Sequence, residues 1–177
     1  MAFTTEQPPA SPIWSLLADE TLAKAAPTLT ASWIGNYSLL KIILIATFVG
    51  GSDLPAIYFN GDQGINYSLH GFGLIESSGL MNLEGSSGQR ANYPACSDVS
   101  SSIADLLVLN ISTSEKIITG TIEGTTGLGG GNKYNCTAVW GGKWYNTTDP
   151  ITSINVYGID NGYSLTAGSR IIVLGRA

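Results

Sequence analysis

The stretch YSLLKIILIATFV, residues 37–49, decides the fold class of this chain. Its apolar residues form a nearly continuous run that is rich in isoleucine, which favours a buried β-strand. A membrane-spanning helix needs roughly 20 apolar residues, whereas the run from Leu39 to Gly51 has about a dozen and includes Lys41. We therefore predict a central strand here and no association with a membrane.

Outward from this strand, turn signals recur about every 8–12 residues, as is typical of a sandwich or barrel. Residues 28–34 alternate like a strand, while residues 17–26 have a pattern that also fits one or two helical turns. Further strands are expected at 55–60, 66–73, 79–85, 102–113, 115–125, 134–145, 151–159 and 168–175. We expect hairpins to join 55–60 with 66–73 and 102–113 with 115–125. A bulge or bend is expected at Gly141 and Gly142.

The fold class that follows is all-β, an antiparallel, jelly-roll-like β-sandwich. A chain of 177 residues is normally one domain, which we place at residues 13–177. Residues 1–12 contain three prolines and no periodicity, so they are interpreted as an extended, flexible arm. Charged residues are only 12% of the chain, about half the usual share. This composition fits either a protein that packs against copies of itself or a stable extracellular β domain.

Charge and residue types exclude several functions. The net charge is −5 and no run of Lys or Arg occurs, so the basic stripe that nucleic-acid binding needs is lacking. The single histidine, His70, lies in an expected strand without a recognisable nucleophile or acid partner. We therefore expect no enzymatic activity and no cofactor. The two cysteines, Cys96 and Cys136, fit either a disulfide or two buried thiols.

The segment YFNGDQGINYS, residues 58–68, fits a cation site, a sugar site or a structural turn. Calcium needs six to eight oxygen ligands, and Asp62 is the only carboxylate of the segment, so no metal is expected. Asn and Asp side chains bond to their own backbone in tight turns, and glycine tolerates positive φ. We predict a structural turn formed by Asn60, Asp62, Gly64, Asn66 and Tyr67. Asp62→Asn should then cost under about 1 kcal/mol.

Three aromatic residues in VWGGKWYN, residues 139–146, suggest a different site. Trp140, Trp144 and Tyr145 could form a platform on which a host glycan stacks. Trp140 and Trp144 are an even number of residues apart, so they share one side of an unbroken strand. Core packing is the alternative interpretation of the same residues.

Two segments resemble a known family. LPAIYFNGDQGINYS, residues 54–68, is similar to an F-N-x-D-x-G-x-N-Y segment of virion structural proteins of tailed phages. Residues 151–177, with "GSRIIVLG", resemble the C-terminal pattern of the same proteins, and residues 13–46 resemble their lead-in.

The resemblance implies a non-enzymatic virion protein on the exterior of the capsid or tail. A capsid decoration (cement) protein is the first expectation, and a tail, baseplate or receptor-binding, carbohydrate-binding module is the alternative. The implied partners are copies of itself, trimers among them, and major capsid or tail proteins.

Overall fold

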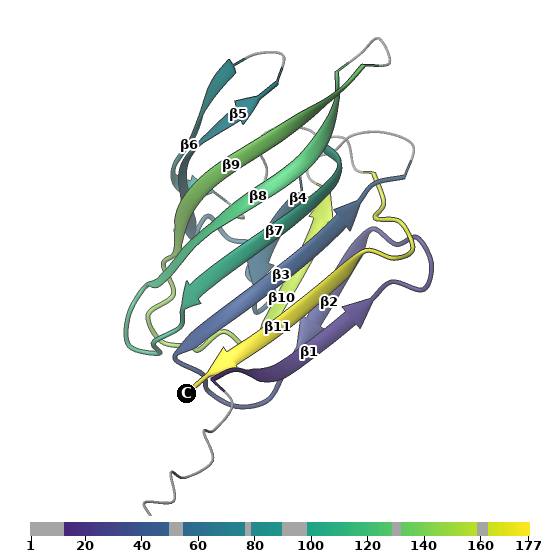
Figure 1. The fold of residues 1–177 in the computed structure, drawn as a ribbon. Helices are drawn as coiled ribbons and strands as arrows, with labels where there is room; N and C mark the ends of the chain where they lie inside the picture. Colours follow the sequence, from purple (N-terminus) through teal and green to yellow (C-terminus); the bar gives the residue numbers. More distant parts are fainter. Residues whose placement is uncertain (1–12, 50–54, 77–78, 90–98, 129–131, 159–162) are drawn as a thin grey trace, which may run out of the picture.

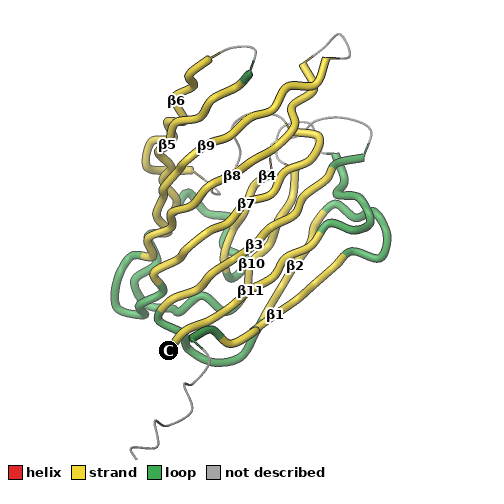
Figure 2. Tube along the Cα trace, in the orientation of Figure 1, coloured by secondary structure: helices red, strands yellow, loops and turns green. Residues whose placement is uncertain are grey.

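The computed structural model describes residues 13–49, 55–76, 79–89, 99–128, 132–158 and 163–177 (Figure 1). Side chains are not described at residue 75, in residues 79–100 or at residues 126–128 and 132–134. The expected arm, residues 1–12, and Cys96 lie outside the described residues. Within the described part, all regular elements are strands (Figure 2), which confirms the all-β prediction.

Eleven strands occur in the described chain. Their bounds are β1 Ser15–Thr21, β2 Thr28–Ser32, β3 Leu39–Thr47, β4 Pro55–Phe59, β5 Tyr67–Ile75, β6 Gly79–Gln89, β7 Val99–Leu109, β8 Lys116–Leu128, β9 Asn132–Trp144, β10 Ser153–Gly158 and β11 Arg170–Arg176.

The strands form two antiparallel sheets packed as a sandwich, as predicted. The larger sheet has eight strands in the order β1-β11-β3-β7-β8-β9-β5-β6, and the smaller has three in the order β2-β10-β4. In Figure 1 the three-stranded sheet lies behind the half of the large sheet that contains β3 and β11. The strand predicted from residues 37–49 is β3, which is central in the large sheet between β11 and β7.

Alternation along β3 shows which face of the large sheet is buried. Leu40, Ile42, Leu44 and Ala46 are fully buried, and the residues between them are partly exposed. Buried residues of β7, β8, β9 and β11 continue this inner face, and Leu29, Ile57, Ile154 and Val156 of the small sheet belong to the same core cluster. The core is therefore the layer between the two sheets.

The helical alternative for residues 17–26 is wrong, because this segment begins within β1. Asp19 pairs with Ile172 and Thr21 with Arg170 on β11. The side chain of Arg170 also bonds both carboxylate oxygens of Asp19, at 2.7 and 2.6 Å. Ladder bonds to β11 satisfy the backbone of this segment, and such pairing overrides a weak local helix propensity.

Two details of strand connection also differ from expectation. The strands at 55–60 and 66–73 do not form a hairpin, because β4 pairs with β10 in the small sheet and β5 pairs with β6 and β9 in the large one. No bulge occurs at Gly141 and Gly142, since β9 keeps its register with β5 and β8 through both glycines. The hairpin of β7 and β8 is confirmed.

Candidate functional site

The loop from Asn60 to Asn66 carries the chain from the small sheet to the large one. It begins with a tight turn in which the Asp62 N–H donates to the Phe59 carbonyl at 2.9 Å. The two central residues, Asn60 and Gly61, have φ of 51° and 71°. Asn-Gly is the preferred pair for a turn with two positive φ values. Gly64 is not among the glycines with positive φ, because the chain reverses three residues earlier, at Gly61.

Asn60 fixes this turn to the start of β10. Its Oδ1 accepts hydrogen bonds from the backbone N–H groups of Thr152 and Ser153, at 2.9 and 3.1 Å. Its Nδ2 donates to the carbonyl of Pro150 at 2.8 Å. One side chain thus satisfies three backbone groups about 90 positions away in the sequence, which sets the register of β4 against β10.

Asp62 fixes the other end of the loop to β9. Its Oδ2 accepts from the indole Nε1–H of Trp144 at 2.7 Å and from Asn66 Nδ2 at 2.9 Å. Its Oδ1 accepts from the Gly64 N–H at 2.8 Å and from Asn66 Nδ2 at 3.2 Å. Both carboxylate oxygens are therefore occupied by donors of the protein itself.

The pKa of Asp62 reflects this environment. Partial burial acts to raise the pKa, but the hydrogen bonds from Trp144, Asn66 and Gly64 together outweigh it and hold the pKa below 3.8, the ordinary value. The carboxylate is thus charged at neutral pH and accepts all of these bonds in its ionised form.

Tyr67 completes the loop from inside the core. Its buried hydroxyl donates to the Asp62 carbonyl and accepts from the Phe59 N–H, both at 3.0 Å. Burial raises the pKa of the Tyr67 phenol well above its usual range, so it stays protonated and keeps its donor. The Tyr67 ring stacks on Trp144, with ring centroids 6.4 Å apart and planes 13° apart.

The five residues of the predicted structural turn thus occupy one segment, and four of them make side-chain bonds within or across it. Gly64 contributes a backbone N–H instead. No group of three or more His, Cys, Asp or Glu that could hold a metal occurs among the described residues. The arrangement is a junction between two sheets rather than the register-fixing hairpin that the sequence suggested.

The aromatic residues of β9 lie where the core-packing interpretation places them. Because β9 is unbroken at Gly141 and Gly142, Trp140 and Trp144 point to the same side. That side is the inner face, and their exposed fractions are 2% and 1%. A sugar stacks on an indole only if a ring face is open to solvent. The glycan platform of Trp140, Trp144 and half-buried Tyr145 is therefore corrected: two of its three rings belong to the core.

Lys116 is a residue that the sequence did not single out. It is fully buried, its Nζ lies 5.9 Å from the centre of the Trp144 ring, and it donates to the carbonyls of Ser114 and Asn146 at 2.8 and 2.9 Å. Desolvation lowers its pKa, while the charge of Asp149 acts in the opposite direction. Its only sequence signal is a charge at an inward position of an alternating strand.

Cys136 is buried on the inner face of β9 and takes part in a disulfide bond. The chain has one other cysteine, Cys96, which lies outside the described residues. The pairing of Cys96 with Cys136 therefore stays a prediction.

The opposite face of the large sheet, here called the outer face, is unusually apolar. Eight of its large apolar side chains are 37–62% exposed: Leu16, Phe72, Leu74, Ile103, Leu107, Leu109, Ile117 and Val139. Registered rows such as Phe72, Val139, Thr121, Asp105 and Ile43 run across it from β5 to β3. Directly opposite residues share a face, so these apolar side chains all lie on the same side of the sheet, with polar residues such as Thr121 and Asp105 between them.

Charges on the outer face largely cancel. Three ion pairs, 2.6–2.9 Å long, lie on it or at its edge: Lys41 with Asp105, Arg170 with Asp19, and Lys143 with Glu115. The other two charged residues with described side chains in strands of this face, Glu123 and Arg176, have opposite signs. The net charge of −5 is thus not concentrated here.

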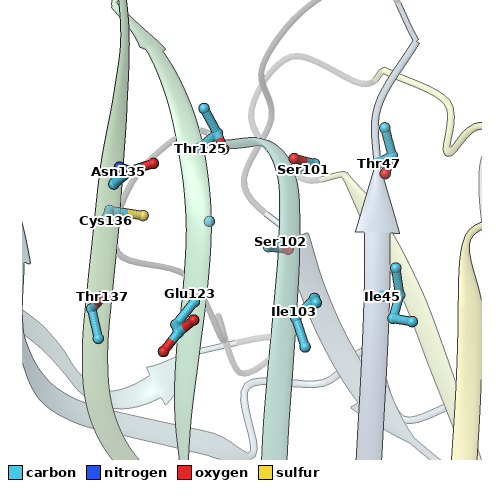
Figure 3. Close-up of a pocket in the computed structure, with 11 residues that line it drawn as sticks. Ile45, Thr47, Ser101, Ser102, Ile103, Glu123, Thr125, Asn135, Cys136 and Thr137 are labelled. Atoms are coloured by element: carbon cyan, nitrogen blue, oxygen red, sulfur yellow. The ribbon is translucent and has the colours of Figure 1, made fainter.

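A hollow of about 400 Å³ lies at the end of the outer face where β3, β7, β8 and β9 meet (Figure 3). Ile45 and Ile103 form its apolar part. Its polar lining comes from hydroxyl, amide and carboxylate side chains on four neighbouring strands: Thr47, Ser101, Glu123, Thr125, Asn135 and Thr137.

The search for known relatives gives no assignment. No protein-family model, no curated protein and no solved structure matched the chain. No helix long and apolar enough to cross a membrane was found in the described residues.

Proposed function

We propose that this chain is a non-enzymatic structural component of a phage-like virion, first of all a capsid decoration protein. The observation that carries the proposal is the outer face. Its exposed apolar side chains lie on five strands, β1, β5, β7, β8 and β9, and its charges are mostly neutralised in pairs. Exposed apolar patches of this extent mark contact surfaces.

The sequence pattern of β3 supports the same inference. Its apolar residues face both sides, as in strands that are covered on both faces. Within one chain, only the inner face is covered by the small sheet. The outer face thus has the apolar composition of a core layer, and in an assembly it is buried against a neighbouring subunit.

The Asp62 loop supports a structural role for the segment that resembles phage virion proteins. Asn60, Asp62, Asn66 and Tyr67 all bond to groups of this same chain, which is what a rigid building block requires. Many copies of such a block, each bridging shell subunits, stabilise a capsid through mass action and avidity.

Immunogold labelling of purified virions whose genome encodes this chain tests the proposal. A decoration protein gives label distributed over the capsid surface, and a tail component gives label at one vertex or along the tail. Virions that carry no label, with the protein present only in the soluble fraction of the lysate, would contradict a structural role.

A receptor-binding module is the second candidate, and the hollow on the outer face favours it. Sugars are bound by converging hydroxyl, amide and carboxylate groups, and Glu123, Asn135 and Thr137 supply these types there. A glycan array probed with the wild-type chain and with Glu123→Gln separates this candidate from the first. Specific signals that the variant loses would favour it, and a blank array would remove it.

A further inference from the structure

We infer that the partner of the outer face is a second copy of this chain, docked face to face around a two-fold axis near Leu107. The inference rests on the proposed function only in using the outer face as the contact surface. It adds that the chain first pairs with a second copy of itself, so that a dimer is the unit that joins a particle.

The area of the outer face fits such a dimer. Its eight most exposed apolar side chains are on average about half exposed. A large apolar residue presents roughly 150–200 Å² when fully exposed, so these eight offer on the order of 600–800 Å². A stable interface buries about 800 Å² per partner, whereas the largest apolar patch of a typical monomer is about 300–600 Å².

The charges of the outer face permit contact with itself. A chain with a net charge of −5 repels its own copy unless the contact surface is close to neutral. On the outer face, Lys41 lies 2.9 Å from Asp105 and Arg170 lies 2.6 Å from Asp19, so each charge already has its partner. A strongly charged partner would instead require unpaired charges of one sign.

The shape of the face fits as well. Two sheets pack face to face about 10 Å apart through the interdigitation of side chains that stand out from each pleat. Of the eight strands, β7 is the fourth in order, so its outward residues lie near the middle of the surface across the strands. Ile103 and Leu107 flank Asp105, whose charge is paired with Lys41. A two-fold contact is self-complementary and places residues near its axis opposite their own copies.

Sedimentation equilibrium of the full chain tests the inference. The wild type is expected at about 37 kDa, twice the chain mass of 18.5 kDa. Leu107→Glu and Leu107→Lys each place like charges on both sides of the axis, so each should raise the dissociation constant at least about 100-fold and give a monomer. An equimolar mixture of the two variants should recover the dimer, because opposite charges then meet.

Ile34→Glu and Ile34→Lys are matched controls. Ile34 is 96% exposed and lies in the loop between β2 and β3, away from the outer face. Both control variants should keep the dimer mass, and circular dichroism should show the same strand spectrum in all four variants.

A wild type that stays monomeric up to about 100 μM, a trimer, or a mixture of the Leu107 variants that stays monomeric would each overturn the inference. These results are distinct from failure of the virion role. A monomer that still labels virions removes only the self-contact. A dimer whose virions carry no label removes only the virion role.

Discussion

Asp62→Asn replaces one carboxylate oxygen by an amide group and leaves the side-chain shape almost unchanged. In the wild type both oxygens face donors: Oδ1 faces the Gly64 N–H, and Oδ2 faces the Trp144 indole N–H. Asparagine has only one acceptor oxygen, so in either orientation its NH₂ group opposes a donor. The variant therefore loses at least one hydrogen bond to a charged group.

The size of the loss follows from these contacts. A hydrogen bond to a charged group contributes about 1.5–3 kcal/mol, and a buried donor left without a partner costs a similar amount. Asp62 is half-buried, so contact with water and charge screening make the loss of stability smaller than this sum. We expect a loss of about 2 kcal/mol in the free energy of unfolding, more than the sequence alone suggested, which lowers Tm by about 4–8 °C in a domain of this size.

The effect should also depend on pH. The pKa of Asp62 is held below 3.8 in the folded chain, so its contribution is fully present above that value and is lost as the pH falls through the lower, folded-state pKa. The difference in stability between wild type and Asp62→Asn should thus be constant near pH 7 and shrink below about pH 4.

Urea unfolding followed by tryptophan fluorescence measures this difference. Glu20→Gln is the control, because the exposed Glu20 carboxylate has no hydrogen bond or ion pair with any described residue, and we expect little change. An Asp62→Asn midpoint equal to that of the control would show that the bonds from Gly64 and Trp144 to the carboxylate do not stabilise the fold. A rise in Tm with added Ca²⁺ that Asp62→Asn abolishes would show instead that the carboxylate is an ion ligand.

Three further predictions concern the core and the cysteines. Gly120→Ala should lower the free energy of unfolding by about 1–3 kcal/mol, because the added Cβ would lie 2.3 Å from the Asp105 carbonyl oxygen. The control Gly141→Ala should change the urea midpoint little, because its Cβ meets nothing closer than 3.4 Å. Equal effects of the two variants would contradict this prediction. Tyr67→Phe removes a buried hydroxyl with two backbone partners and should lower the free energy of unfolding by about 2 kcal/mol in the same assay. A loss below about 0.5 kcal/mol would show that these two hydrogen bonds are dispensable. The denatured, unreduced chain should show no free thiol and the reduced chain two, because Cys136 is disulfide-bonded; a free thiol before reduction would exclude the pairing with Cys96.

Local patterns predicted the strands well and their partners poorly. The nearly continuous apolar run of residues 37–49 and the apolar segment 168–175 gave β3 and β11, because apolar runs rich in isoleucine and valine favour strands. The short glycine-containing connection at residues 61–65, however, is also a common hairpin signal, and it led to the wrong partner for β4. The true partner, β10, lies about a hundred residues further along the chain, and no local pattern encodes that pairing.

The sites were predictable to a similar degree. Turn chemistry correctly gave structural roles to Asn60 and Asp62, because Asn and Asp satisfy backbone donors in tight turns. The contact of Asp62 with Trp144 spans 82 positions, so the sequence could not show that the aromatic residue and the loop belong to one network. The outer face was missed because a continuous apolar run indicates burial on both sides and does not say what covers the second side.

An electron-microscopy map of the native particle would show directly what covers the outer face. We expect the outer face, including Leu107, to be buried against another subunit, while the loop from Asn60 to Asn66 keeps its bonds within the chain. A map in which the outer face is open to solvent in every copy, and the chain contacts its neighbours through other surfaces, would contradict this expectation.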